Sequence, residues 1–174
     1  KGFIWSSEKD NFNHLYHYDN AGKLVNQITK GNWDVVSFNG YDEKLNLLYY
    51  ISTERGQINR DVYSIKLDGT NKKRLSTAEG TSSADFSAGF KYYVSAYSNA
   101  NTPPIYELHS ADGKLIKVLE DNAELKTKMK EYNLSIKEFF TFKNTDGIEL
   151  NGWMMKPQNF DPNKNILYIC LPIT

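Results

Sequence analysis

The residues of this chain that could carry out acid–base or nucleophilic chemistry are few and far apart. The histidines are His14, His17 and His109, and the one cysteine is Cys170. Catalysis by an imidazole or a thiol requires a partner group within hydrogen-bond reach, and no local motif supplies one. We therefore expect the histidines to pack on the surface or between neighbouring sheets, and Cys170 to be a buried, inert thiol.

A second set of candidates consists of acidic residues near turns and strand ends: Glu54, Asp61, Asp68, Asp85 and Asp112. A calcium-binding loop would require a denser alternation of oxygen ligands than any of these segments shows. Aspartate is common in turns because its carboxylate accepts hydrogen bonds from nearby backbone N–H groups. The sequence therefore predicts no catalytic, substrate-binding or metal-binding residue in this chain, and no cofactor.

Two tryptophans, Trp5 and Trp33, could form a platform on which a sugar or a peptide stacks. Large aromatic side chains on strands more commonly pack between neighbouring sheets. We expect packing rather than ligand binding at both positions.

A unit that occurs three times must position these residues. Each copy contains a tyrosine-bearing strand, a glycine turn and an apolar residue six positions after the glycine. The tyrosines Tyr16, Tyr63 and Tyr106 are 47 and 43 residues apart. Such a period with several short strands is typical of four-stranded propeller blades, whereas helical repeats of similar length show 3.6-residue periodicity. We predict a mainly β chain containing a partial β-propeller of about two and a half four-stranded antiparallel blades.

Each copy is expected to contain further strands. The strand before each tyrosine strand is predicted at residues 3–8, 45–54 and 91–98, and the outer strand at 23–29, 72–76 and 114–119. Inner strands are predicted near 34–38 and 84–87, while the first copy has no room for one.

Side-chain alternation along the tyrosine strands predicts which face of each strand is buried. We place Tyr63 and Tyr106 at matching positions on a buried apolar face. Glu107 and His109 then fall on the opposite, less apolar face.

A different pattern begins after residue 120. The spacing of Leu125, Met129 and Tyr132 predicts a helix over residues 122–133. The turn sequence at 144–147 predicts a hairpin formed by residues 136–142 and 148–155. After a loop that contains two prolines, residues 166–171 form a continuous apolar run, which predicts a buried strand.

The charge balance gives no reason to expect a nucleic acid partner. Lysine plus arginine and aspartate plus glutamate number 21 each, so no net positive charge would attract phosphate groups or an anionic membrane. No stretch approaches the roughly 20 apolar residues that a membrane span needs. The first residues also lack the layout of a signal peptide, and the composition leaves the compartment open.

The order of these elements resembles the prolyl oligopeptidase family of serine peptidases, and most closely its dipeptidyl peptidase IV branch. The segments Thr29-Lys30-Gly31-Asn32-Trp33-Asp34-Val35 and Val118-Leu119-Glu120-Asp121-Asn122 are the most specific to that branch. Further matching segments span nearly the whole chain. One departure is the ending Leu171-Pro172-Ile173-Thr174, where relatives turn through a Tyr-Gly-Gly-Pro or Tyr-Ala-Gly-Pro sequence.

The resemblance implies two domains. Residues 1–120 would be the C-terminal blades of the propeller, and residues 121–174 the connecting helix and first strands of a truncated α/β-hydrolase domain. The catalytic serine, aspartate and histidine would follow this chain, which contains no Gly-x-Ser-x-Gly motif. We therefore expect the chain alone to be inactive.

The resemblance also implies the activity and partners of the full-length parent. It would remove N-terminal dipeptides with proline or alanine in the penultimate position, with the propeller gating access of the peptide substrates. It would be a homodimer, exported or periplasmic in a bacterium, while the isolated fragment would self-associate. A non-catalytic propeller that serves as a scaffold for protein partners is the alternative, although such a scaffold would not begin a new domain after residue 135.

Overall fold

The computed structural model describes residues 2–164, which contain thirteen strands and one helix. In chain order the elements are β1 (Gly2–Ser7), β2 (His14–Asp19), β3 (Leu24–Gln27), β4 (Val35–Asp42), β5 (Leu47–Ser52), β6 (Asp61–Lys66), β7 (Lys73–Arg74), β8 (Thr81–Phe86), β9 (Tyr92–Asn99), β10 (Thr102–Ser110), β11 (Leu115–Glu120), α1 (Ala123–Glu131), β12 (Lys137–Lys143) and β13 (Glu149–Met155).

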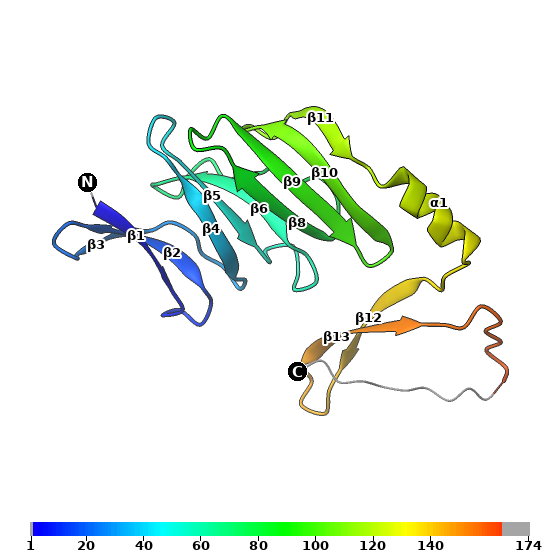
Figure 1. Ribbon diagram of the computed structural model, residues 1–174. Helices are drawn as coiled ribbons and strands as arrows, with labels where there is room; N and C mark the ends of the chain where they lie inside the picture. Colours follow the sequence, from blue (N-terminus) through cyan, green and yellow to red (C-terminus); the bar gives the residue numbers. More distant parts are fainter. Residues whose placement is uncertain (1, 165–174) are drawn as a thin grey trace. The chain divides into compact units, whose positions relative to one another are not determined.

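The strands form four antiparallel sheets (Figure 1). The first blade has the order β1-β2-β3, the second β4-β5-β6-β7 and the third β8-β9-β10-β11. The fourth sheet is the hairpin β12-β13. The chain is therefore mainly β, with the partial set of propeller blades that the repeat predicts, and the strands predicted within residues 2–164 are all present.

The described chain divides into two compact units on either side of the Lys126–Thr127 bond. The three blades lie in the first unit, and the hairpin β12-β13 lies in the second. The assignment of residues 121–174 to an α/β-hydrolase domain stays a prediction. The strand predicted at 166–171, with Cys170, lies outside the described residues.

The glycine turn after each tyrosine strand gives the blades a shared shape. Gly22, Gly69 and Gly113 have φ angles of 78°, 83° and 89°, in the left-handed region that glycine adopts without steric cost. A Cβ atom on Gly69 would lie 3.0 Å from the carbonyl oxygen of Ile28. This turn of the second blade thus packs closely against the first blade.

Counting back from the turn defines the equivalent positions of the second and third blades. The backbone N–H of Lys66 closes the turn in the second blade, and that of Ser110 closes it in the third. From there inward, β6 pairs with β5 and β10 pairs with β9 in the same regular register. The position of Tyr63 is therefore taken by Glu107 in the third blade, and not by Tyr106.

The prediction that Tyr106 lies on a buried face is wrong. Tyr106 is 41% exposed, whereas His109 is only 9% exposed. The third copy has one more residue between its tyrosine and its glycine than the other two copies. A shift of one residue moves a strand side chain to the other face of the sheet, so the two faces of β10 are exchanged relative to the prediction.

The first interface, between the first and second blades, is filled by apolar and aromatic side chains. Tyr50 stacks on Tyr63 with ring centroids 5.5 Å apart, and on Trp33 at 6.4 Å. Trp33 is buried, which confirms its predicted packing role. Together these residues belong to one buried cluster: Leu15, Ile28, Trp33, Val35, Leu48, Tyr50, Tyr63 and Ile65.

The second interface, between the second and third blades, contains a separate buried cluster: Tyr49, Ile51, Val62, Leu75, Ala84 and Tyr93. Tyr49 packs against Phe86, with ring centroids 4.3 Å apart. Each side of the second blade therefore contacts a neighbour, which explains why both faces of β5 and β6 carry hydrophobic residues.

Trp5 does not pack between blades within the described residues. It lies on β1 at the position that Tyr50 holds on β5, and it is 60% exposed. Tyr50 is covered by the first blade, whereas the described chain places no blade against the equivalent face of β1.

Candidate functional site

A pocket of about 230 Å³ lies in the second interface. Val62, Leu75 and Ser76 of the second blade line one side, and residues of β8, β9 and β10 line the other. The polar groups that face it come mainly from the third blade: Ser82, Ser95, Tyr97, Glu107 and His109. Its lining combines apolar side chains with several polar groups, which is the usual composition of a small-molecule site.

Glu107 and His109 form a hydrogen bond in this pocket. His109 Nε2 lies 3.0 Å from Glu107 Oε2. Because a carboxylate oxygen can only accept, the imidazole must donate from Nε2. The other ring nitrogen, Nδ1, lies 3.3 Å from the carbonyl oxygen of Gly113, and it can donate to that oxygen only when the ring is doubly protonated.

Tyr93 packs against the imidazole ring of His109. The two rings stack with centroids 5.0 Å apart and planes 8° from parallel. Burial raises the pKa of Tyr93 to about 12, and the carboxylates of Glu107 and Asp112 add to the rise.

A buried carboxylate lies next to the pocket, at the start of β6. Asp61 is 1% exposed, and its Oδ1 accepts a hydrogen bond of 2.7 Å from the Ser76 hydroxyl. The Ser76 oxygen in turn accepts from the backbone N–H of Val62 at 3.2 Å. Arg55 and Arg74 each place one Nη1 atom at ion-pair distance from Oδ1, 3.8 and 3.9 Å away. Two cations thus offset the cost of burying this charge.

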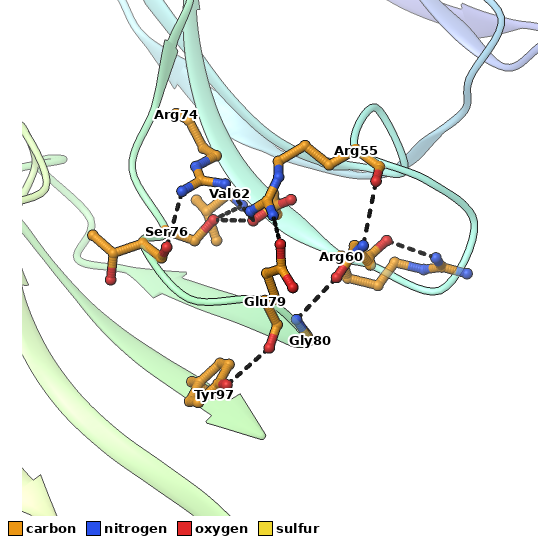
Figure 2. Close-up of polar contacts among 11 residues, drawn as sticks. Arg55, Arg60, Val62, Arg74, Ser76, Glu79, Gly80 and Tyr97 are labelled. Carbon is orange, nitrogen blue, oxygen red and sulfur yellow. Dashed lines mark hydrogen bonds and ion pairs between the residues drawn. The ribbon is translucent and has the colours of Figure 1, made fainter. Parts of the chain in front are cut away.

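The two arginines reach this point from different segments of the second blade, as Figure 2 shows. Arg55 also pairs with Glu79 at 2.8 Å, and Arg74 donates to the carbonyl of Thr77 at 2.9 Å. Tyr97 of β9 donates to the carbonyl of Glu79 at 2.8 Å. The loop between β7 and β8 is therefore tied to both blades beside the pocket.

The first blade has a neutral counterpart of this arrangement. His14 stands where Asp61 stands, and Thr29 where Ser76 stands, since Thr29 likewise accepts from the N–H of the next strand residue. His14 Nε2 lies 2.9 Å from the Gly31 carbonyl and Nδ1 lies 3.1 Å from the Thr29 hydroxyl. A carbonyl only accepts, so Nε2 donates to Gly31, and in the neutral ring Nδ1 accepts from the Thr29 hydroxyl. His14 is thus packed, as expected, and the absence of a chemical role for it stays a prediction.

The other predicted candidates are not brought into one site. Asp68 and Asp112 lie in turns and accept hydrogen bonds from the hydroxyls of Thr70 and Ser110, as predicted. Glu54 pairs with Lys72. Asp85 lies on β8, and His17 lines a larger open hollow of about 660 Å³ in which the first blade meets the second.

The site does not assemble a nucleophile and a base. Within residues 2–164, neither ring nitrogen of His109 contacts a hydroxyl or a thiol. No group of three or more His, Cys, Asp or Glu residues that could hold a metal ion occurs in the same part of the chain. The pocket is suited to holding a polar ligand rather than to covalent catalysis.

Sequence reasoning did not find Ser95, Glu107 and Asp61 as neighbours of one pocket. The available signal was the tyrosine-to-glycine distance, which is six residues in two copies and seven in the third. Alignment on the glycine turn instead of the tyrosine would have placed Glu107 and His109 on the interface.

Comparison with known proteins identifies the family. The family model described as dipeptidyl peptidase IV (DPP IV) N-terminal region matches residues 1–104. The chain belongs to the dipeptidyl peptidase IV family. The matched residues contain the first two blades and strands β8 and β9 of the third, whereas the pocket residues Glu107 and His109 lie beyond them.

Similar proteins come from fungi and bacteria. Dipeptidyl peptidase 4 of Trichophyton tonsurans is 33% identical over 174 residues, which are 98% of this chain and 22% of the relative. The crystal structure of Porphyromonas gingivalis dipeptidyl peptidase 4 is 41% identical, with a TM-score of 0.88 over 94% of this chain and 23% of that chain. A structure from Bacteroides ovatus, 24% identical with a TM-score of 0.76, has the same fold. This chain spans about a fifth of the length of these relatives.

No helix among residues 2–164 is long and apolar enough to cross a membrane.

Proposed function

We propose that this chain is part of a serine-type dipeptidyl peptidase that removes N-terminal dipeptides, with proline or alanine in the penultimate position, from peptides. The observation that carries the proposal is the match to the P. gingivalis enzyme across 94% of the chain, at 41% identity and a TM-score of 0.88. The hairpin β12-β13 after the third blade also supports a peptidase over a pure propeller scaffold, because a scaffold has no need of a second unit.

In this proposal the blades gate access of peptide substrates, while the serine, aspartate and histidine are supplied by the rest of the protein. The chain alone would be inactive, since acyl transfer needs a nucleophile, a base and an oxyanion hole held together. The same resemblance supports a homodimeric parent that is exported or periplasmic in a bacterium.

The test uses Xaa-Pro and Xaa-Ala dipeptide reporter substrates and a fluorophosphonate that labels activated serines. We expect the full-length protein to cleave both reporters and to be labelled, and the 174-residue chain to do neither. A full-length protein that folds but neither cleaves nor labels would favour the scaffold. Turnover by the purified chain would contradict the assigned position of the active site.

We also propose that the isolated chain self-associates. Phe3, Trp5 and Tyr106 are each at least 41% exposed on faces of the first and third blades that no other described strand covers. Exposed apolar sheet faces and edges are templates for association. Sedimentation should show oligomers whose population rises with concentration, and a monomer over the whole accessible range would refute the proposal.

A further inference from the structure

We propose that the pocket in the second interface binds a primary ammonium or guanidinium group carried on a short apolar stem. The proposal does not depend on the proposed function.

The pocket exists because the third blade lacks the aromatic residues that fill the first interface. Counted from the glycine turn, Ser95 takes the position of Tyr50, and Glu107 takes the position of Tyr63. Two stacked rings are thus replaced by a hydroxyl and a carboxylate. The hollow of about 230 Å³ lies where those rings would pack.

The charge of the pocket selects a cation. Among the described residues that line it, Glu107 is the one carboxylate, there is no lysine or arginine, and His109 is the one side chain that could carry a positive charge. His109 holds Oε2 of Glu107 at 3.0 Å, which orients the carboxylate and leaves Oε1 to accept from a ligand N–H. An anionic ligand would meet Glu107 directly and would be repelled.

The remaining walls fit the stem and the other N–H donors of such a group. Val62, Leu75 and Ile105 supply apolar contacts, while the hydroxyls of Ser82 and Ser95 can accept hydrogen bonds. The volume of about 230 Å³ lies below the roughly 300–1,000 Å³ of sites for drug-sized ligands. The occupant is therefore the size of a single basic side chain or a small alkyl amine.

Calorimetric titration of the full-length protein with butylammonium, 1-butanol and butyrate tests the charge preference. We expect binding of butylammonium, with 1-butanol at least about tenfold weaker and butyrate weaker still. Equal binding of butylammonium and 1-butanol would show that the pocket recognises only the stem and would overturn the proposal.

Variants locate the binding. Glu107→Gln keeps the side-chain shape and removes the charge, so it should weaken butylammonium binding by about tenfold or more. Glu131→Gln, on the exposed helix α1, is the matched control and should leave butylammonium binding unchanged. Ser95→Leu fills the hollow without touching the charge and should also abolish binding. Butylammonium affinity that is unchanged in folded Glu107→Gln or Ser95→Leu protein would refute this location.

Two peptides capped at both ends distinguish the source of the amine. If the natural occupant is a basic peptide side chain, a capped lysine peptide will compete with butylammonium and its Nε-acetylated form will not. If only the free amine binds, neither peptide will compete, and the site takes small amines.

Discussion

The two interfaces of the second blade use the same backbone positions for different purposes. In the first interface Tyr50 and Tyr63 are 0% and 4% exposed and stack within a continuous core. In the second interface the equivalent positions carry Ser95 and Glu107, which line a pocket. The paired strand positions are equivalent in both interfaces, so the side chains at these positions determine whether this part of the interface is filled or leaves a pocket.

The comparison also shows how a repeat can host a binding site at little cost to the fold. The hydrogen bonds that pair neighbouring strands of a blade are made within its own sheet, and they remain when interface side chains change. Stability should therefore be concentrated in the first interface, and ligand recognition in the second.

The largest difference in stability is expected between alanine substitutions at the equivalent positions Tyr50 and Ser95. Tyr50→Ala removes a fully buried ring that contacts both Trp33 and Tyr63, and it should cost about 3–5 kcal/mol of unfolding free energy. Ser95→Ala should cost less than about 1 kcal/mol, because it removes only a hydroxyl at a cavity wall. Urea denaturation measures both, and similar losses would show that the second interface is packed as tightly as the first.

A second comparison tests the corrected face assignment of β10. Tyr63→Ala should cost about 3 kcal/mol, because that ring is buried in the first interface. Tyr106→Ala should change the unfolding free energy by no more than about 0.5 kcal/mol, because surface substitutions rarely do more. A large loss at Tyr106 in the monomer, with a small loss at Tyr63, would restore the face assignment made from the sequence.

Asp61 and His14 occupy equivalent positions in the second and first blades. Asp61 is held by two arginines, whereas His14 is held by a hydroxyl and a carbonyl. Asp61→Asn keeps the bond from Ser76 and leaves Arg55 and Arg74 without their shared anion, so it should cost about 1–3 kcal/mol. His14→Gln in the first blade serves as the neutral comparison. Because Asp61 is buried and salt screens buried pairs little, we expect added salt to leave the effects of Asp61→Asn and His14→Gln largely unchanged.

The smallest expected effect on stability comes from the Asp-Gly turns, which lie outside the interfaces and are shared by the second and third blades. Hydrogen bonds from Thr70 lower the pKa of Asp68, and hydrogen bonds from Ser110 and the Lys114 backbone lower that of Asp112. A carboxyl whose pKa is lower in the folded chain stabilises it above the unfolded pKa of about 3.9, and this contribution is lost as the pH falls through the folded value.

NMR titration of the two carboxyl groups should therefore give both pKa values below the ordinary value for aspartate. A normal pKa at only one of them would show that the turns differ as well as the interfaces.

Much of the fold could be predicted from the sequence because its signals are local. Alternation of apolar residues predicted the strands, Asp68-Gly69 and Asp112-Gly113 predicted the turns, and the period of the tyrosines predicted the blades. The family could be recognised from short segments for the same reason. Each of these features depends on residues close together in the chain.

The candidate site could not be predicted in that way. Whether Tyr106 or His109 faces the neighbouring blade depends on one extra residue before Gly113, and a shift of one exchanges the two faces of a strand.

The sequence by itself determined the strands, the turns and the propeller repeat, because these follow from local backbone preferences and side-chain periodicity. Only the tertiary structure decided that Asp61 is buried between Arg55 and Arg74, and that Glu107 and His109 line a pocket. The physical reason is that burial and electrostatic environment depend on which residues meet across an interface, and these partners come from different blades or distant segments of one blade.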